Sequence, residues 1–242
     1  MSDIDPLKNV RIVLCEPSHP GNIGAAARAM KTMGLSDLHL VKPQRFPDHE
    51  AMWRATNATD VLDDAKVHET LDHALQGVAF AVACSARRRD VAVPGTTVRE
   101  AAARAIEVAR SQAVALVFGN ESHGLTTDDV NKCRLLASIP ANPRFSSLNL
   151  AAAVQVFAYE LRVAAEIASS EGPRRELATH EQVEGFYTHL EQAMAETGFL
   201  NVEHPKKLMP KLRRLFARTD LDVEEINILR GILKAFAQPK KR

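Results

Sequence analysis

The sequence is poor in cysteine and in long apolar runs. Its 242 residues include three cysteines, Cys15, Cys84 and Cys133, which lie far apart and form no C-x-x-C pair. That spacing argues against a zinc site and against a disulfide scaffold, and it is typical of the reducing cytosol. No stretch approaches the roughly 18 apolar residues of a membrane span, and the acidic N-terminus lacks the apolar core of a secretory signal. We therefore expect a cytoplasmic protein without a metal centre.

The chain also lacks an excess of charge of either sign. It has 31 Lys and Arg against 30 Asp and Glu, a net charge of +1. Any nucleic-acid binding therefore has to come from a local basic cluster. Neither a G-x-x-x-x-G-K-[ST] loop nor a G-x-G-x-x-G fingerprint occurs, which disfavours a nucleotide-binding Rossmann enzyme. The apolar share of 45% is ordinary for a globular protein, and the length suits one large domain or a domain plus a smaller one.

Short apolar segments alternate with helical segments along the first two thirds of the chain. This alternation predicts an α/β fold, with a parallel sheet covered by helices on both faces. Such sheets bind ligands at the carboxyl ends of their strands, so we expect one site in the loops 16–24, 85–89, 119–124 and 141–149. The predicted strands are residues 10–15, 38–41, 67–68, 78–84, 113–118 and 135–139, and the predicted helices include residues 48–58, 97–110 and 127–133.

Three segments in these loops each have a functional and a purely structural interpretation. Residues 21–28 open an Ala-rich helix, whose N-terminus could bind a phosphate or could simply begin a core helix with an exposed Arg28. In residues 116–125, glycines leave room for a ligand ring against the main chain, or form a plain turn. Ser146, Ser147 and Asn149 precede another helix, where they could line a ligand loop or cap the helix.

Together the three segments resemble the motifs of the SpoU branch of the SPOUT RNA methyltransferases. Asn22, Gly24 and Arg28 match the motif N-x-G-x-x-x-R, and residues 119–125 match G-N-E-x-x-G-L. Residues 139–140 and 147–150 match I-P…S-L-N-[VL]. The order and approximate spacing agree over about residues 8–165. Within the branch the chain is most similar to the tRNA (cytidine/uridine-2′-O)-methyltransferases, and residues 212–233 extend that similarity to the C-terminal part.

The resemblance implies the SPOUT fold with a C-terminal trefoil knot, a homodimer, and a cofactor, S-adenosyl-L-methionine, that leaves as S-adenosyl-L-homocysteine. It implies methylation of the ribose 2′-hydroxyl at position 32 in the tRNA anticodon loop. An rRNA methyltransferase and a non-catalytic RNA-binding knotted protein are the alternatives. The cofactor residues carried over by the motifs are Cys84, Ser85, Ala86, Gly119, Asn120, Gly124, Ile139, Ser146, Ser147, Leu148 and Asn149.

The resemblance also supplies a catalytic group of Arg28, Asn22, Glu121, Ser147 and Asn149. A guanidinium stays protonated in proteins, so we expect Arg28 to clamp a phosphate and stabilise a developing alkoxide rather than act as a base. Ser147 and Asn149 would position the ribose or the loop of the second motif. Glu121 could accept a proton or could order its loop.

The composition changes after Ala168, where a polar segment predicts a linker. We expect a methyltransferase domain at residues 1–168, a linker at 169–178 and an all-helical extension at 179–242, with helices at 179–197, about 205–217 and 223–237. Residues 204–218 hold six Lys or Arg and no acid, which indicates either tRNA phosphate contacts or a solvated helix face. The predicted RNA-binding residues are Arg28, Arg87, Lys206, Lys207, Lys211, Arg213 and Arg214.

Overall fold

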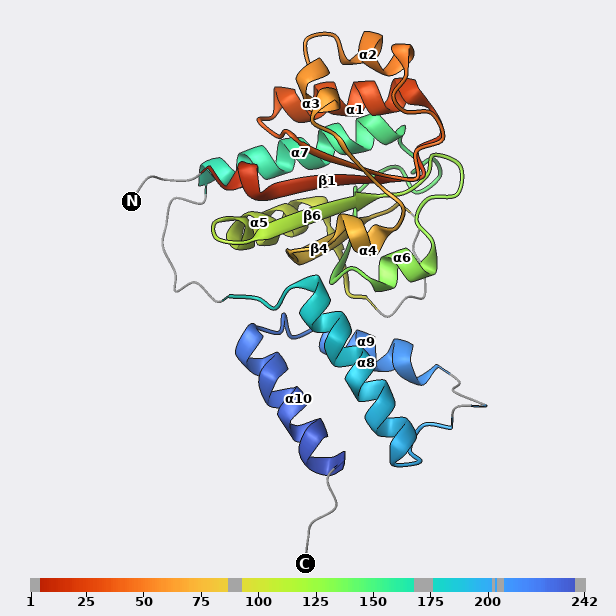
Figure 1. Cartoon of the computed structure of the whole chain (residues 1–242). Helices are drawn as coiled ribbons and strands as arrows, with labels where there is room; N and C mark the ends of the chain where they lie inside the picture. The colour runs from red at the N-terminus through yellow and green to blue at the C-terminus, as the bar shows by residue number, and fades with distance from the viewer. Residues whose placement is uncertain (1–4, 87–92, 168–175, 202, 204–206, 238–242) are drawn as a thin grey trace, which may run out of the picture.

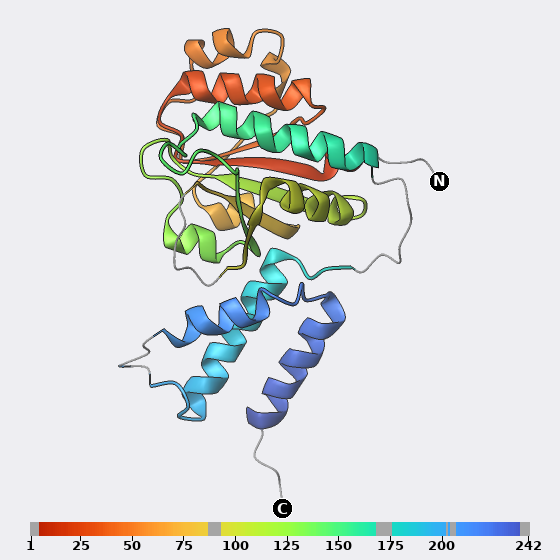
Figure 2. The ribbon, with the colours of Figure 1, turned by 180° about the vertical axis from the view of Figure 1, so that it is seen from behind.

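A parallel β-sheet with helices on both faces forms the larger part of the molecule (Figures 1 and 2). The computed structural model describes residues 5–86, 93–167, 176–201, 203 and 207–237. Seven strands pair in the order β3-β2-β1-β6-β4-β7-β5, all parallel, so the predicted α/β fold class is confirmed. The strands are β1 Val10–Cys15, β2 Asp37–Val41, β3 Lys66–His68, β4 Val78–Cys84, β5 Gly95–Thr97, β6 Ala113–Phe118 and β7 Leu135–Ser138.

The helices divide between the two faces of the sheet. One face carries α1 Pro20–Thr32, α2 His49–Ala55, α3 Thr59–Asp63, α5 Val98–Ala109 and α7 Leu150–Ile167, whose apolar residues share one core with β1 and β6. The short helices α4 Leu71–Ala74 and α6 Thr127–Asn131 cover the other face. Burial on both faces explains why the inner strands β4 and β6 are continuous apolar runs rather than alternating ones.

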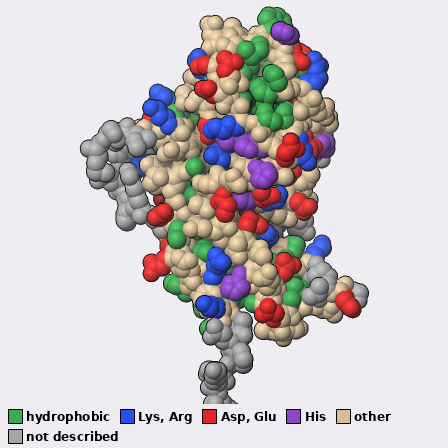
Figure 3. Space-filling view, in the orientation of Figure 1, with side chains coloured by type: hydrophobic (Ala, Val, Ile, Leu, Met, Phe, Trp, Pro, Cys, Tyr) green, Lys and Arg blue, Asp and Glu red, His purple; other side chains and the backbone are tan. Residues whose placement is uncertain are grey.

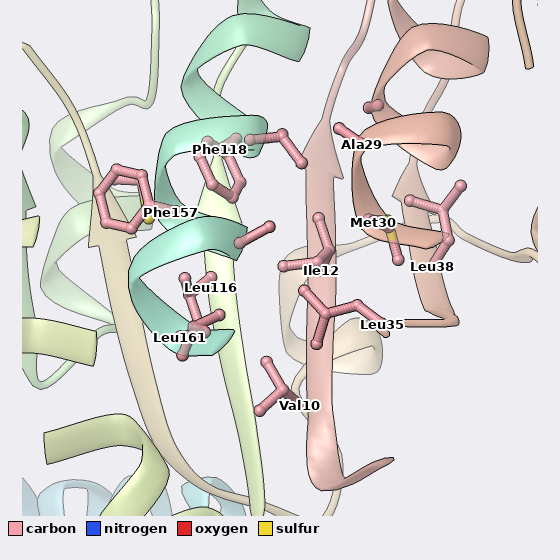
Figure 4. Packing of buried hydrophobic residues seen from close by; sticks show 14 of the residues in the cluster. Val10, Ile12, Ala29, Met30, Leu35, Leu38, Leu116, Phe118, Phe157 and Leu161 are labelled. Atoms are coloured by element: carbon pink, nitrogen blue, oxygen red, sulfur yellow. The ribbon is translucent and has the colours of Figure 1, made fainter. Parts of the chain in front are cut away.

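The central strands and α7 pack tightly beneath the carboxyl edge of the sheet (Figure 4). Phe118 ends β6 and meets Phe157 of α7 edge to face, with ring centroids 5.3 Å apart. Along the same strands, Val10, Ile12 and Leu116 are buried against the helices. Each phenylalanine is only 2% exposed. Together they form a rigid apolar floor at the end of the sheet where the loops converge.

The structure corrects several predicted boundaries. The helix predicted at residues 48–58 ends at Ala55, because Thr56 takes the left-handed conformation at φ 54°, and α3 follows as a separate helix. The strand predicted at 135–139 ends at Ser138. Strand β5 was not predicted, since its three residues contain a glycine and lead directly into α5; it is identified only by its pairing with β7.

Helices α8 His180–Glu196, α9 Leu208–Phe216 and α10 Val223–Ala237 form a group below the sheet (Figure 1). Helices were predicted for this C-terminal part. They have an apolar core of their own around Phe186, Tyr187 and Ile226. The Gln112 side chain donates to the carbonyl of Leu177 at 2.7 Å and accepts from its N–H at 2.8 Å, which ties the group to the sheet. The domain division at 1–168, 169–178 and 179–242 stays a prediction, and most of the predicted linker lies outside the described residues.

Two absences apply to the described part of the chain. No helix there is long and apolar enough to cross a membrane. No group of three His, Cys, Asp or Glu side chains there is arranged to hold a metal ion.

Candidate functional site

A cavity of about 290 Å³ opens at the carboxyl ends of β4, β6 and β7. Strand β6 lies beside β1 in the sheet, and β4 and β7 follow in that order, so four predicted loops meet at one edge, as parallel strand direction requires. Three of the loops line the cavity and the fourth, after β1, supports them. The lining residues are Cys84, Ser85, Ala86, Phe118, Gly119, Asn120, Glu121, Ser122, Gly124, Ile139, Ser146, Ser147, Leu148, Leu150, Ala153 and Phe157.

Every predicted cofactor residue except Asn149 lines this cavity. The structure adds five residues that we did not predict: Phe118, Ser122, Leu150, Ala153 and Phe157. Three of these, at positions 150, 153 and 157, have the i, i+3, i+7 spacing of one helix face, which was visible in the sequence. The cavity therefore combines an apolar wall from β6 and α7 with polar groups from the loops.

A chain of side-chain hydrogen bonds joins the three motif segments beside the cavity. Asn149 Nδ2 donates to Asn22 Oδ1 at 2.8 Å. Asn22 Nδ2 in turn donates to Glu121 Oε1, also at 2.8 Å. Residues 127 and 99 positions apart are thereby held in one network. We call this network the Asn149–Asn22–Glu121 chain.

Asn149 also caps helix α7, a role that the sequence offered equally to Ser146 and Ser147. Its Oδ1 accepts from the N–H of Ala151 at 2.9 Å, which satisfies a free donor of the first turn. One amide side chain thus serves the helix with its oxygen and the motif network with its nitrogen. Ser146 and Ser147 remain free of the cap and line the cavity instead.

The carboxylate of Glu121 is held by several donors. Oε2 accepts from the N–H and the hydroxyl of Ser18, at 2.9 and 2.8 Å, and Oε1 accepts from Asn22 and from the N–H of His19. Partial burial raises the pKa of Glu121, but the hydrogen bonds from Asn22 and Ser18 outweigh it and lower the pKa to about 2. A group with this pKa is a poor proton acceptor near neutral pH, so the geometry favours the loop-ordering interpretation.

Asn120 organises the same loop from inside. Only 6% of this residue is exposed. Its Nδ2 donates to the carbonyl of Glu16 at 2.7 Å, and its Oδ1 accepts from the N–H of Ser122 at 2.8 Å. With both ends of its amide bonded within the protein, Asn120 shapes the cavity wall and fixes the loop against the end of β1.

Two motif glycines are explained by packing rather than by ligand approach. A Cβ on Gly24 would lie 2.0 Å from the carbonyl oxygen of Ala51, so this glycine lets α1 and α2 cross at close range. A Cβ on Gly119 would lie 2.1 Å from the N–H nitrogen of Leu125, where the loop closes on itself. Phosphate binding at the start of α1 stays a prediction, because this packing does not test it.

Arg28 lies on the exposed side of α1 and does not line the cavity of its own chain. Its guanidinium has no hydrogen-bond or ion-pair partner among the residues that the structure describes. The predicted catalytic residues thus separate into two groups. Asn22, Glu121, Ser147 and Asn149 gather at the cavity or the network beside it, and Arg28 stands apart from them.

The predicted basic residues of the extension also separate. Lys207, Lys211 and Arg214 are exposed on or just before α9. Arg213 instead forms a bidentate pair with Glu184 of α8, at 2.6 and 2.7 Å, and its guanidinium lies 4.3 Å from the ring centroid of Tyr187. Arg213 therefore joins two helices of the extension. Arg87 and Lys206 lie outside the described residues.

Comparison with known proteins agrees with this arrangement. Residues 9–159 match the model of the SpoU rRNA Methylase family, and residues 181–242 match the model described as "tRNA methyltransferase TrmJ, C-terminal domain". The chain is 47% identical to the tRNA (cytidine/uridine-2′-O-)-methyltransferase TrmJ of Salmonella typhimurium, over 97% of this chain and 99% of that protein.

Two solved structures are similar over different lengths. The crystal structure of TrmJ from Z. mobilis ZM4 is 35% identical with a TM-score of 0.82, covering 94% of this chain and 99% of that one. An AdoMet-bound rRNA methyltransferase from Sinorhizobium meliloti is 25% identical with a TM-score of 0.54, covering 69% of this chain and 60% of that one. The similarity to the Z. mobilis structure is long enough to include the C-terminal helices. The similarity to the S. meliloti structure is consistent with the sheet domain alone.

Proposed function

Because the chain belongs to the SpoU rRNA methylase family, we propose that it methylates the ribose 2′-hydroxyl of a cytidine or uridine in tRNA, with S-adenosylmethionine as the methyl donor. The target is position 32 of the anticodon loop. The observation that carries the proposal is the Asn149–Asn22–Glu121 chain, which joins the three motif segments of the family beside one cavity. The similarity to TrmJ proteins along almost the whole chain supports tRNA as the substrate.

The donor set of the cavity fits S-adenosylmethionine. Phe118, Leu148 and Phe157 offer an apolar wall for a purine ring, and Ser85 and Ser146 add polar groups to the lining. The negative charge of Glu121 lies in the cavity lining, where it favours a cationic ligand. When bound, this cofactor supplies the reactive methyl carbon and the sulfur that leaves with the electron pair.

The protein's own task is then to align the ribose hydroxyl and to stabilise the charge that forms on it. Asn22 and Asn149 fix the relative positions of α1, the motif loop and the start of α7, so the two walls of the site cannot drift apart. Arg28 binds a phosphate next to the target ribose and stabilises the developing alkoxide through its fixed positive charge. Glu121 orders the loop as a permanently charged acceptor.

A homodimer completes the site in this proposal. Large apolar side chains are exposed on segments that border the cavity, with Phe145 of the cavity loop at 80% and Tyr159 of α7 at 52%. Contact with a second copy would bury them. A homodimer would also give Arg28, which does not line its own cavity, a place beside the cavity of the other chain. Residues 139–160 would form the trefoil knot that the family relationship implies.

The exposed bases of α9 bind the tRNA backbone. Lys207, Lys211 and Arg214 face solvent on the same helical group that matches the TrmJ C-terminal model. Phosphate contacts of this kind position an RNA without reading its bases. We keep Lys206 and Arg87 in the proposed surface as predictions, and we leave Arg213 out because Glu184 already occupies its guanidinium.

The alternative is methylation of rRNA by the same site. The sheet domain alone does not distinguish the two substrates, because its similarity extends to an rRNA enzyme. The TrmJ-like extension favours tRNA. Labelled methyl transfer from S-adenosylmethionine to total tRNA, set against ribosomal RNA, decides between them. Arg28→Ala is expected to abolish transfer while cofactor affinity stays within a few-fold, and normal turnover in that variant would contradict the catalytic assignment.

A further inference from the structure

A second cavity, of about 190 Å³, opens at the carboxyl ends of β1, β2 and β3. Its floor is apolar and consists of Cys15, Val41 and Leu71, which are 7%, 5% and 3% exposed. Its rim is polar. The catalytic proposal uses neither the floor nor the rim, although an apolar pocket with a few convergent polar groups is the usual form of a ligand site.

The rim is built from the residues that directly follow three neighbouring strands: Glu16, Lys42 and Glu69. Glu16 and Lys42 are in the left-handed region, at φ 50° and 45°, which side chains other than that of glycine rarely adopt. The sheet holds them there, because Glu16 N–H donates to Val41 at 2.7 Å and Lys42 N–H donates to His68 at 3.0 Å. Strain of this kind concentrates at functional positions.

The second cavity adjoins the first across the loop of the G-N-E motif. Gly124 lines both cavities. The carbonyl of Glu16, at the rim, accepts the hydrogen bond from Asn120 that fixes this loop. Ser18, two residues after Glu16, donates to Glu121. A ligand that spans the loop would therefore touch both cavities, and the same hydrogen bonds set the shape of each.

The chemistry of the rim selects a neutral, flat, polar-edged ligand over an anion. Carboxylates of Glu16, Glu69 and Asp129 stand beside Lys42 and Lys132 in the lining, and Lys132 is already paired with Asp72. A phosphate would meet more negative than positive charge there. His123 supplies the one aromatic ring of the lining among the described residues. In Figure 3, histidine side chains lie beside acidic and basic ones at mid-height on the face seen in Figure 1.

We propose that this cavity takes the base of the nucleotide whose ribose is methylated. The proposal rests on the function proposed above. An unstacked base in an RNA loop is recognised by apolar contact, by stacking on a side-chain ring and by hydrogen bonds to its edges. The floor of the cavity provides the apolar contact, and the ring of His123 provides the stacking surface. The Lys42 donor and the carboxylate acceptors of the rim provide the hydrogen bonds. Their mixture suits both pyrimidines, which differ in whether the group at C4 donates or accepts.

The test changes two of the three rim side chains without disturbing the backbone. Lys42→Gly deletes a side chain at a position whose φ suits glycine, and Glu69→Gln neutralises an exposed acceptor. Thr56→Gly is the matched control. Thr56, like Lys42, has a positive φ, here 54°, but it follows α2 and does not line the cavity. Single-turnover methylation is measured on tRNA transcripts that carry C, U, A or G at the target, with cofactor affinity measured by calorimetry.

We expect the wild-type protein to methylate tRNA with a pyrimidine at the target faster than tRNA with a purine there. The Lys42→Gly, Glu69→Gln double variant should reduce the ratio of these two rates about tenfold or more. Its cofactor affinity should match wild type, and Thr56→Gly should keep the full ratio. A double variant with the wild-type ratio overturns the base pocket, as does a preference that follows the flanking nucleotides instead. Failure of the wild type to methylate any RNA would refute the proposed function itself, and that result is visible before any variant is compared.

Discussion

The amide of Asn149 donates to the side-chain oxygen of Asn22 at 2.8 Å, across 127 positions of sequence. Because Asn22 donates onward to Glu121, the start of α7, the start of α1 and the loop after β6 are fixed relative to one another. Each of these segments carries one motif of the SpoU family. The network explains why an asparagine, whose side chain can both donate and accept, stands in the first motif and again in the third.

Removing the side chain of Asn22, the middle residue of this network, should lower the rate of methyl transfer strongly and the free energy of unfolding only slightly. In Asn22→Ala, Asn149 and Glu121 each lose a partner, and the motif segments are no longer fixed to one another. A misplacement of about 1 Å is expected to lower kcat by about 10²-fold. Asn57→Ala, on an exposed loop, is the control. Equal turnover of Asn22→Ala and wild type, measured with saturating cofactor, would show that the network has no positioning role.

The depressed pKa of Glu121 predicts a pH dependence of stability. The pKa is about 2 in the folded chain and about 4.3 in an unfolded one. The ionised carboxylate therefore stabilises the fold fully above about pH 5, and this contribution is lost as the pH falls toward 2. Urea unfolding should show Glu121→Gln less stable than wild type at pH 7, with a gap that shrinks between pH 5 and pH 3. Glu196→Gln, on the exposed end of α8, should show no such change. A gap independent of pH would refute the assignment.

The same carboxylate should be absent from the pH profile of the reaction. If Glu121 orders the loop and does not accept a proton, the rising limb of kcat against pH in wild type and in Glu121→Gln should have the same midpoint at different heights. Single-turnover rates between pH 5.5 and 9 measure this. Loss of the limb in Glu121→Gln would make Glu121 the proton acceptor after all.

Two helical glycines should respond oppositely to replacement by alanine, because Gly24 lies where α1 and α2 cross and Gly231 lies in open space. Gly24→Ala forces a Cβ to within 2.0 Å of the Ala51 carbonyl, and overpacking of this kind costs about 1–3 kcal/mol. Gly231, in α10, has open space around its missing Cβ, so Gly231→Ala should gain up to about 1 kcal/mol from helix propensity. The free energy of unfolding in urea measures both. A Gly24→Ala protein as stable as wild type would mean that the helices cross farther apart.

The basic residues of α9 predict a difference in salt dependence. Lys211→Ala with Arg214→Ala removes two exposed cations, so the slope of log Kd for tRNA against log salt concentration should become shallower by about 1.5. Arg213→Ala breaks the pair with Glu184 and should lower the stability of the extension while leaving the slope unchanged. A shallower slope in Arg213→Ala, with none in the double variant, would reverse our assignment of the two groups.

Regular elements and their loops could be predicted from the sequence because the signals are local. Apolar runs such as residues 78–84 and 113–118 gave the strands, and strand direction brought the loops of residues 85–86 and 119–124 together. Strand β5 could not be predicted in this way, since three residues carry too little pattern and the strand forms only against β7.

Side-chain partners could not be predicted, because they depend on the path of irregular loops. Nothing near Arg213 in the sequence reveals Glu184, 29 positions earlier, so a charge run alone grouped Arg213 with the exposed bases. In the same way the cap of α7 was left open among three residues until the geometry selected Asn149. The second cavity escaped prediction because Glu16, Lys42 and Glu69 follow different strands and belong to no motif.

The most direct measurement of the central proposal is mass-spectrometric mapping of ribose methylation in tRNA incubated with the protein and S-adenosylmethionine. We expect one 2′-O-methylated nucleotide, a cytidine or uridine at position 32, in wild-type reactions and none with Arg28→Ala. Methylation of a base rather than a ribose, methylation at another position, or no product in tRNA while ribosomal RNA is modified, would contradict it.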